Sequence, residues 1–159
     1  MRLRGVVSED FCNYKKPSMF LISAECDWKC CKEAGKDVSI CQNAPLLSAP
    51  VTDIPNEQLV KMYLANDITQ AIVVGGLEPM LQIDELDDLL TKLRESGCED
   101  PFVVYTGYYP EEIPNELSRL RGRGVIVKFG RFLPDRSGRF DELLGVPLVS
   151  ENQYAVELA

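Results

Sequence analysis

The sequence predicts a single α/β domain built as an open, incomplete βα barrel with mostly parallel strands. Apolar segments of strand length alternate with segments of helical periodicity along most of the chain, which is typical of a parallel sheet with helical crossovers. The chain has 159 residues, whereas a closed eight-unit barrel takes about 250. It can therefore supply only part of a barrel. No linker, internal repeat or low-complexity segment divides it, so we expect one domain over residues 1–159.

Four short apolar segments are the expected strands of this sheet. The first is Ser18–Ser23, which follows a proline, and the second is Ala71–Gly76, which ends in two glycines. Two further runs occur at 101–107 and at 124–130, the latter rich in β-branched residues. In a parallel sheet the carboxyl ends of these strands lie at one edge, where ligands bind.

Three segments between the strands show apolar residues at helical spacing, over residues 56–65, 82–96 and 110–120. The residues expected to face the core are Leu59, Met62, Tyr63, Leu86, Leu89, Leu90, Leu93, Ile113, Leu117 and Leu120. The tail after Gly130 has lost this alternation. We expect it to form loop and short strand across one end of the domain.

Charge and hydropathy exclude several classes of protein. The chain carries 25 acidic and 17 basic residues, a formal charge of -8, and so lacks the basic field that binds a phosphate backbone. Charged residues interrupt the apolar runs near the N-terminus, and no later run approaches the length of a membrane span. We therefore expect no nucleic-acid partner, no signal peptide, no membrane span and a cytoplasmic location.

Four of the six cysteines lie within sixteen residues that directly follow the first predicted strand: Cys26, Cys30, Cys31 and Cys41. In a reducing cytoplasm, clustered thiols are more often metal ligands or redox groups than disulfides. The chain has no histidine, so a metal site here would be all-thiolate, holding zinc or an iron–sulfur cluster. The segment is too polar for these thiols to be simple core residues.

The cysteine segment carries a resemblance to a known family. CDWKC followed by ICQN resembles the cluster-binding loop of radical S-adenosylmethionine enzymes, in which an apolar or aromatic residue precedes the third cysteine. Here ten residues separate Cys30 from Cys41, and Ile40 takes the apolar place. The resemblance implies a 4Fe–4S cluster held by Cys26, Cys30 and Cys41, with its fourth iron free to bind S-adenosylmethionine. Cys31 is the alternative to Cys30.

Two further motifs resemble parts of the same superfamily. VVGGLEPML is similar to its glycine-glycine-glutamate-proline motif, which implies that Gly75, Gly76 and Glu78 hold the amino end of S-adenosylmethionine. Taken alone, this stretch is also explained as a glycine-rich turn before a helix. Thr106 and Gly107, at the end of the third predicted strand, are expected to contact the adenosine part.

The stretches VVYTGYYPEEI, VKFGRF and SENQY narrow the resemblance to anaerobic ribonucleotide reductase activating proteins, which are glycyl-radical activases. This implies reductive cleavage of S-adenosylmethionine to a 5'-deoxyadenosyl radical, which takes hydrogen from a glycine of a large partner enzyme. A reduced donor such as flavodoxin or ferredoxin would supply the electron. No side chain is expected to act as a catalytic acid, base or nucleophile, because the cofactor supplies the chemistry.

Two alternatives stay open. One is a radical S-adenosylmethionine enzyme with another substrate, such as a small molecule or a modified peptide. The other is a non-catalytic module in which zinc fixes the cysteine loop. Under every reading, Cys12 and Cys98 are expected to be packing or incidental thiols rather than ligands.

Overall fold

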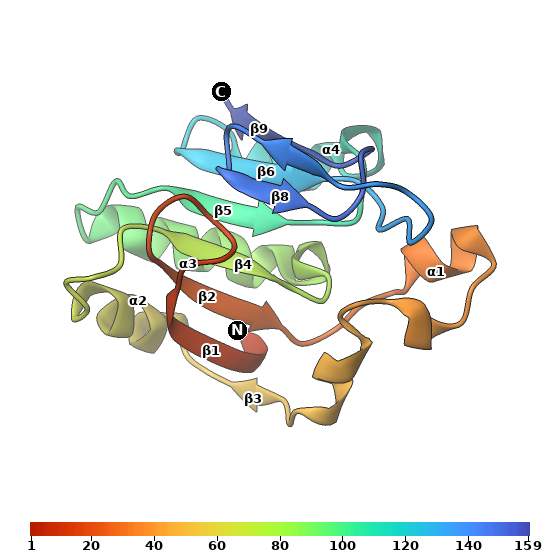
Figure 1. The fold of residues 1–159 in the computed structure, drawn as a ribbon. Helices are drawn as coiled ribbons and strands as arrows, with labels where there is room; N and C mark the ends of the chain where they lie inside the picture. The colour runs from red at the N-terminus through yellow and green to blue at the C-terminus, as the bar shows by residue number, and fades with distance from the viewer.

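The central strands form where β-branched and aromatic residues occur in short runs bounded by turns. The computed structural model describes residues 1–159, and Figure 1 shows a central sheet with α2, α3 and α4 on one of its faces. The strands are β1 (Arg2–Asp10), β2 (Ser18–Ser23), β3 (Thr52–Asp53), β4 (Ile72–Gly76), β5 (Phe102–Tyr105), β6 (Val125–Phe129), β7 (Arg139–Asp141), β8 (Val146–Leu148) and β9 (Tyr154–Leu158).

Four α-helices and four 3₁₀ turns connect these strands. The α-helices are α1 (Lys29–Ala34), α2 (Asn56–Leu64), α3 (Ile83–Glu95) and α4 (Pro114–Leu120). The 3₁₀ turns are η1 (Val38–Ile40), η2 (Ala44–Ser48), η3 (Pro79–Gln82) and η4 (Pro110–Glu112). None of the helices combines the length and apolar character needed to cross a bilayer.

The prediction of a partial βα barrel is wrong. Seven strands form one mixed sheet in the order β3-β1-β2-β4-β5-β6-β9. Only the pairs β2–β4, β4–β5 and β5–β6 are parallel, and the pairs that involve β1, β3 and β9 are antiparallel. The prediction counted the alternating βα units and missed the strands that extend the sheet on both sides. The molecule is a small mixed α/β domain.

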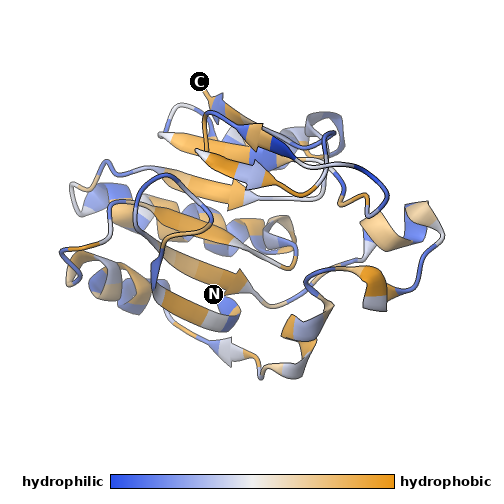
Figure 2. Cartoon of the chain, in the orientation of Figure 1, coloured by the Kyte–Doolittle hydropathy of each residue, from blue (hydrophilic) through white to orange (hydrophobic).

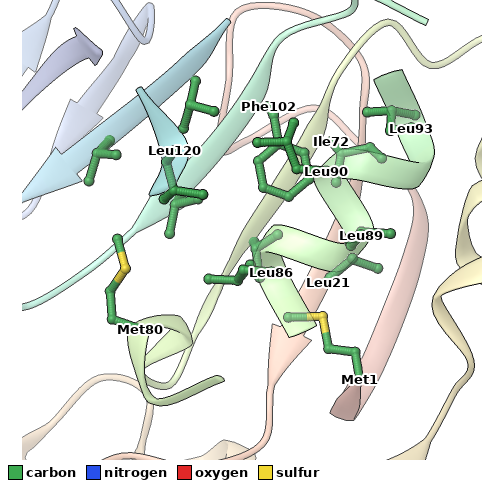
Figure 3. Packing of buried hydrophobic residues seen from close by; sticks show 14 of the residues in the cluster. Met1, Leu21, Ile72, Met80, Leu86, Leu89, Leu90, Leu93, Phe102 and Leu120 are labelled. Carbon is green, nitrogen blue, oxygen red and sulfur yellow. The ribbon is translucent and has the colours of Figure 1, made fainter. Parts of the chain in front are cut away.

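The main core lies between the sheet and the helices. All four leucines predicted on α3 are fully buried, and in Figure 3 they lie beside Ile72 of β4 and Phe102 of β5. In Figure 2 the central strands are strongly apolar, and the helices beside them carry both apolar and polar residues. Met62, predicted to face this core, is 37% exposed, and the neighbouring Val60 is buried instead.

The opposite face of the sheet is covered by a second, smaller core. Val73, Val103 and Ile126 alternate with the helix-facing residues of their strands and pack against Tyr14 and Leu144. Leu144 precedes β8, which forms a separate two-stranded sheet with β7. The tail after Gly130 therefore lies over a face of the sheet, where a barrel would have its interior, and returns to the sheet edge as β9.

Candidate functional site

A cleft lies where the parallel strands β4, β5 and β6 end. Its cavity has a volume of about 110 Å³. The residues of this cysteine cleft that carry chemistry or shape are Cys26, Trp28, Cys30, Cys41, Gly76, Glu78, Thr106, Gly107 and Lys128. The location agrees with the rule that open α/β sheets bind ligands at the carboxyl ends of their strands.

The first cysteine enters the cleft directly from β2. Ser23, the last residue of β2, pairs with Gly76, and the carbonyl of Glu25 accepts a 2.7 Å hydrogen bond from the backbone N–H of Glu78. Cys26 follows, and its Sγ accepts a 3.3 Å hydrogen bond from the backbone N–H of Trp28. The pairing of β2 with β4 therefore places the start of the cysteine segment beside the glycine-rich end of β4.

The long spacing between Cys30 and Cys41 has a structural explanation. Cys30 lies in the short helix α1, which the inserted residues complete and which Gly35 caps with φ +62°. The turn η1 follows, where Asp37 accepts a 2.9 Å hydrogen bond from the backbone N–H of Ser39. These two elements bring the chain back on itself. Cys41 consequently lines the same cavity as Cys26 and Cys30 despite the insertion.

The other three cysteines do not line this cleft. Cys31 is buried and does not line the cleft, but it lines a small neighbouring cavity together with Cys30 and Cys41. Cys12 is exposed, and Cys98 packs beside the main core at the end of α3. No group of three or more Cys, Asp or Glu side chains meets closely enough to hold a metal ion as the side chains stand. Cys26, Cys30 and Cys41 line the same cavity, and binding one metal site would require their side chains to turn toward a common point.

Burial governs the protonation of the cleft thiols. It raises the pKa of Cys26 to about 12, and it also raises the pKa of Cys30. Both groups are therefore thiols at neutral pH in the free protein. A soft metal or an iron–sulfur cluster would displace these protons on binding, which makes metal uptake dependent on pH.

Glu78 is held by the protein rather than presented to solvent. Its carboxylate accepts hydrogen bonds from the backbone N–H of Met80 at 3.0 Å, the hydroxyl of Thr106 at 2.8 Å and the backbone N–H of Gly107 at 2.9 Å. Burial raises its pKa to about 7 despite these donors. Since a carboxylate has about four acceptor positions, one is left for a ligand. The hydrogen bonds that Glu78 accepts from Thr106 and Gly107 connect the end of β4 to the end of β5.

The other sequence-predicted site residues divide into two groups. Gly76, with φ +82°, Thr106 and Gly107 line the cleft. Gly75 and Ile40 do not line it, and Ile40 is 44% exposed. The structure thus brings the ends of β4 and β5 into the cleft, whereas Ile40 lies outside it and lines the small neighbouring cavity with Cys30 and Cys41.

Sequence reasoning missed Lys128, which lies in the floor of the cleft. It is on β6 beside Tyr105 of β5 and is 8% exposed. Its ammonium group has a single hydrogen bond, to the carbonyl of Gly130 at 3.4 Å, and no salt bridge. Burial lowers its pKa to about 8. The sequence did contain an indication of this residue, because lysine is rarely buried and here it lies inside the apolar run VIVKF.

A second, larger cavity of about 350 Å³ adjoins the cysteine cleft. The two share a boundary that includes Asn43, Gly76, Tyr105 and Lys128. The larger cavity extends toward β8 along the face opposite the helices, so a second molecule bound there would lie next to a ligand in the cleft.

Comparisons with protein-family models, with curated proteins and with solved structures found no match to this chain. The resemblance noted above therefore depends on the motifs alone.

Proposed function

We propose that the protein is a radical S-adenosylmethionine enzyme that activates a large glycyl-radical partner, an anaerobic ribonucleotide reductase. One observation carries the proposal: three cysteines, separated in sequence by a helix and a turn, line one cavity at the carboxyl ends of the parallel strands. Thiolates are the ligands that iron–sulfur clusters take, so the donor set fits. When bound, a reduced 4Fe–4S cluster supplies the electron that cleaves S-adenosylmethionine.

The polar groups of the cleft support an amino-acid-bearing ligand. Lys128 offers a buried ammonium without a carboxylate partner, which suits the carboxylate of the methionine part of the cofactor. Glu78 retains one acceptor position for the ammonium of the same part, and the backbones of Gly76 and Gly107 line the cavity beside it. In this proposal the protein binds and orients the cofactor, and the adjoining cavity receives the group that gives up hydrogen.

The cluster is tested first by anaerobic reconstitution of single variants, followed by iron analysis and optical spectra. Alanine at any ligand position is expected to abolish the cluster absorption, because three thiolates are needed to hold it. The ligand positions are Cys26, Cys30 and Cys41, and the matched controls are Cys12, Cys31 and Cys98. A zinc-only protein, or a full cluster in the Cys30→Ala variant, contradicts the assignment.

The reaction is tested by electron paramagnetic resonance. The reconstituted protein, a reduced flavodoxin or ferredoxin, S-adenosylmethionine and a candidate anaerobic reductase are mixed without oxygen. The proposal expects a glycyl-radical doublet on the large chain together with 5'-deoxyadenosine. If 5'-deoxyadenosine forms rapidly with a small molecule and no protein radical appears, the substrate is the small molecule, and the activase assignment is wrong.

A further inference from the structure

Arg131, just beyond β6, is the centre of a cluster of charged and aromatic side chains beside the cysteine segment. Its guanidinium group is only 5% exposed and forms ion pairs with Glu33 at 2.8 Å and with Glu112 at 2.6 Å. It also donates to the carbonyl of Gly107. The rings of Tyr108 and Tyr109 lie with their centroids 5.8 and 5.2 Å from the guanidinium carbon. One side chain thus bridges α1, η4 and the loop after β5.

The cysteine segment is attached to the same cluster at two other points. The Asp27 carboxylate accepts a 2.6 Å hydrogen bond from the hydroxyl of Tyr108, and Lys29 forms an ion pair with Glu112. With the Glu33–Arg131 pair, these contacts fasten the segment at its start, at the first residue of α1 and near the end of α1. Few other contacts are available to a six-residue helix, which is too short to be stable by itself.

The contacts of Arg131 bear directly on the position of Cys30. A Cβ atom placed on Gly107 would lie 3.1 Å from the Cys30 Sγ atom, so the thiol packs against the backbone of Gly107. Arg131 holds Gly107 through its carbonyl and α1 through Glu33. It therefore links the two surfaces between which the thiol lies.

We propose that Arg131 is the positioning residue of the cysteine segment, fixing α1 so that Cys30 faces the cleft before any ligand binds. Arginine suits this task because its planar fork reaches several acceptors at once, whereas lysine is a point charge on a flexible stem. The guanidinium group touches neither the cavity nor a reacting atom, since Arg131 does not line the cleft. Its effect on ligand binding passes through Cys30 and Gly107.

The first test uses the metal-free protein and is independent of the proposed function. Hydrogen exchange follows the backbone N–H groups of Lys32 and Lys36, which are bonded to the carbonyls of Trp28 and Cys31. In Arg131→Met their exchange is expected to be at least about 10-fold faster, because the variant loses the charged hydrogen bonds that hold α1. Alkylation of Cys30, read by peptide mass spectrometry, should accelerate in parallel, with Cys98 unchanged.

Two further variants make the result decisive. Arg123→Met is the matched control, because Arg123 bridges Asp87, Thr91 and a backbone carbonyl on the helix side of the molecule. It should leave the exchange of α1 unchanged. Arg131→Lys should give intermediate protection. Unchanged exchange in Arg131→Met, an equal rise of exchange in α1 and α3, or full protection in Arg131→Lys would each overturn the proposal.

The second test rests on the proposed function. Iron and sulfide are titrated into the wild type and the Arg131→Met variant, and the cluster absorption is recorded. The variant is expected to bind iron more slowly and to lose the cluster faster. If the wild type holds no cluster, the proposed function fails, while the exchange experiment still judges the role of Arg131. If both proteins load and retain the cluster equally, the positioning role is contradicted.

Discussion

Replacing Lys128 with methionine should stabilise the protein while weakening cofactor binding. The lysine is 8% exposed and forms no salt bridge. One long hydrogen bond and the Tyr105 ring, whose centroid lies 5.8 Å from the ammonium, compensate its buried charge only in part. Methionine has a similar length and no charge. If the proposed function holds, the affinity for S-adenosylmethionine, measured on reconstituted protein, should fall by about 10-fold or more, because the cofactor carboxylate would lose the ammonium partner proposed for it.

The magnitude of the stability gain follows from the pKa. Burial lowers the pKa of Lys128 from 10.5 to about 8, and this difference corresponds to about 3 kcal/mol. Below pH 8 both the folded and the unfolded chain bind the proton, so the full cost is present. Between pH 8 and 10.5 the folded chain releases its proton first, and stability rises with pH. Above pH 10.5 both forms are neutral, and the cost disappears.

Urea unfolding of the wild type and of Lys128→Met at pH 7 and at pH 10.5 gives the measurement. At pH 7 the variant should be more stable by up to about 3 kcal/mol, which is roughly 6–12 °C in Tm for a chain of this size. At pH 10.5 the two proteins should converge. Lys61→Met, at an exposed position of α2, is the control. Equal stability at pH 7, or a gain that persists at pH 10.5, would refute this account of Lys128.

Three other predictions address the cleft and the partner. Glu78→Gln should keep the cluster spectrum but lower cofactor affinity in equilibrium binding, and unchanged affinity would leave Glu78 with only its observed contacts to Met80, Thr106 and Gly107. Gly76→Ala should destabilise the fold by about 1–3 kcal/mol in urea unfolding, because φ is +82° and the new Cβ would lie 2.8 Å from Ile22; a neutral effect would contradict this. Binding of the large partner should weaken as salt rises, since the chain carries a charge of -8, and titration calorimetry at two ionic strengths that gave equal affinities would exclude an electrostatic contribution.

The helices and strands that could be predicted from the sequence are those whose apolar residues follow one regular pattern of burial. The leucines of α3 recur at helical spacing, and β2 and β4 are short apolar runs, so their periodicity alone identifies them. Strand β1 was missed because only Leu3 within Arg2–Asp10 is fully buried. It becomes a strand through pairing with β2 and β3. The barrel prediction failed for this reason, since edge strands depend on partners that local sequence does not reveal.

The site was predictable where chemistry is concentrated in sequence. The cysteine segment and the two glycines at the end of β4 stand out in the sequence, and the structure brings Cys26, Cys30 and Cys41 to one cavity. The network around Arg131 was not predictable, because it joins Glu33 to Arg131 across 98 positions. Ion pairs of this kind form because crossover connections bring distant segments together, and no local sequence pattern predicts them.

The packing of Tyr14 and Leu144 against the sheet face opposite the helices sets a limit on the shape of any macromolecular substrate. With this half of the face occupied, its open part is the larger cavity beside β8, which adjoins the cysteine cleft. A chain that reached the cysteine cleft would come in at the carboxyl ends of the strands or through the larger cavity beside β8. If the cysteine cleft acts on a protein, this covered half of the face favours a reacting residue at the tip of a protruding loop over one in the middle of a flat surface.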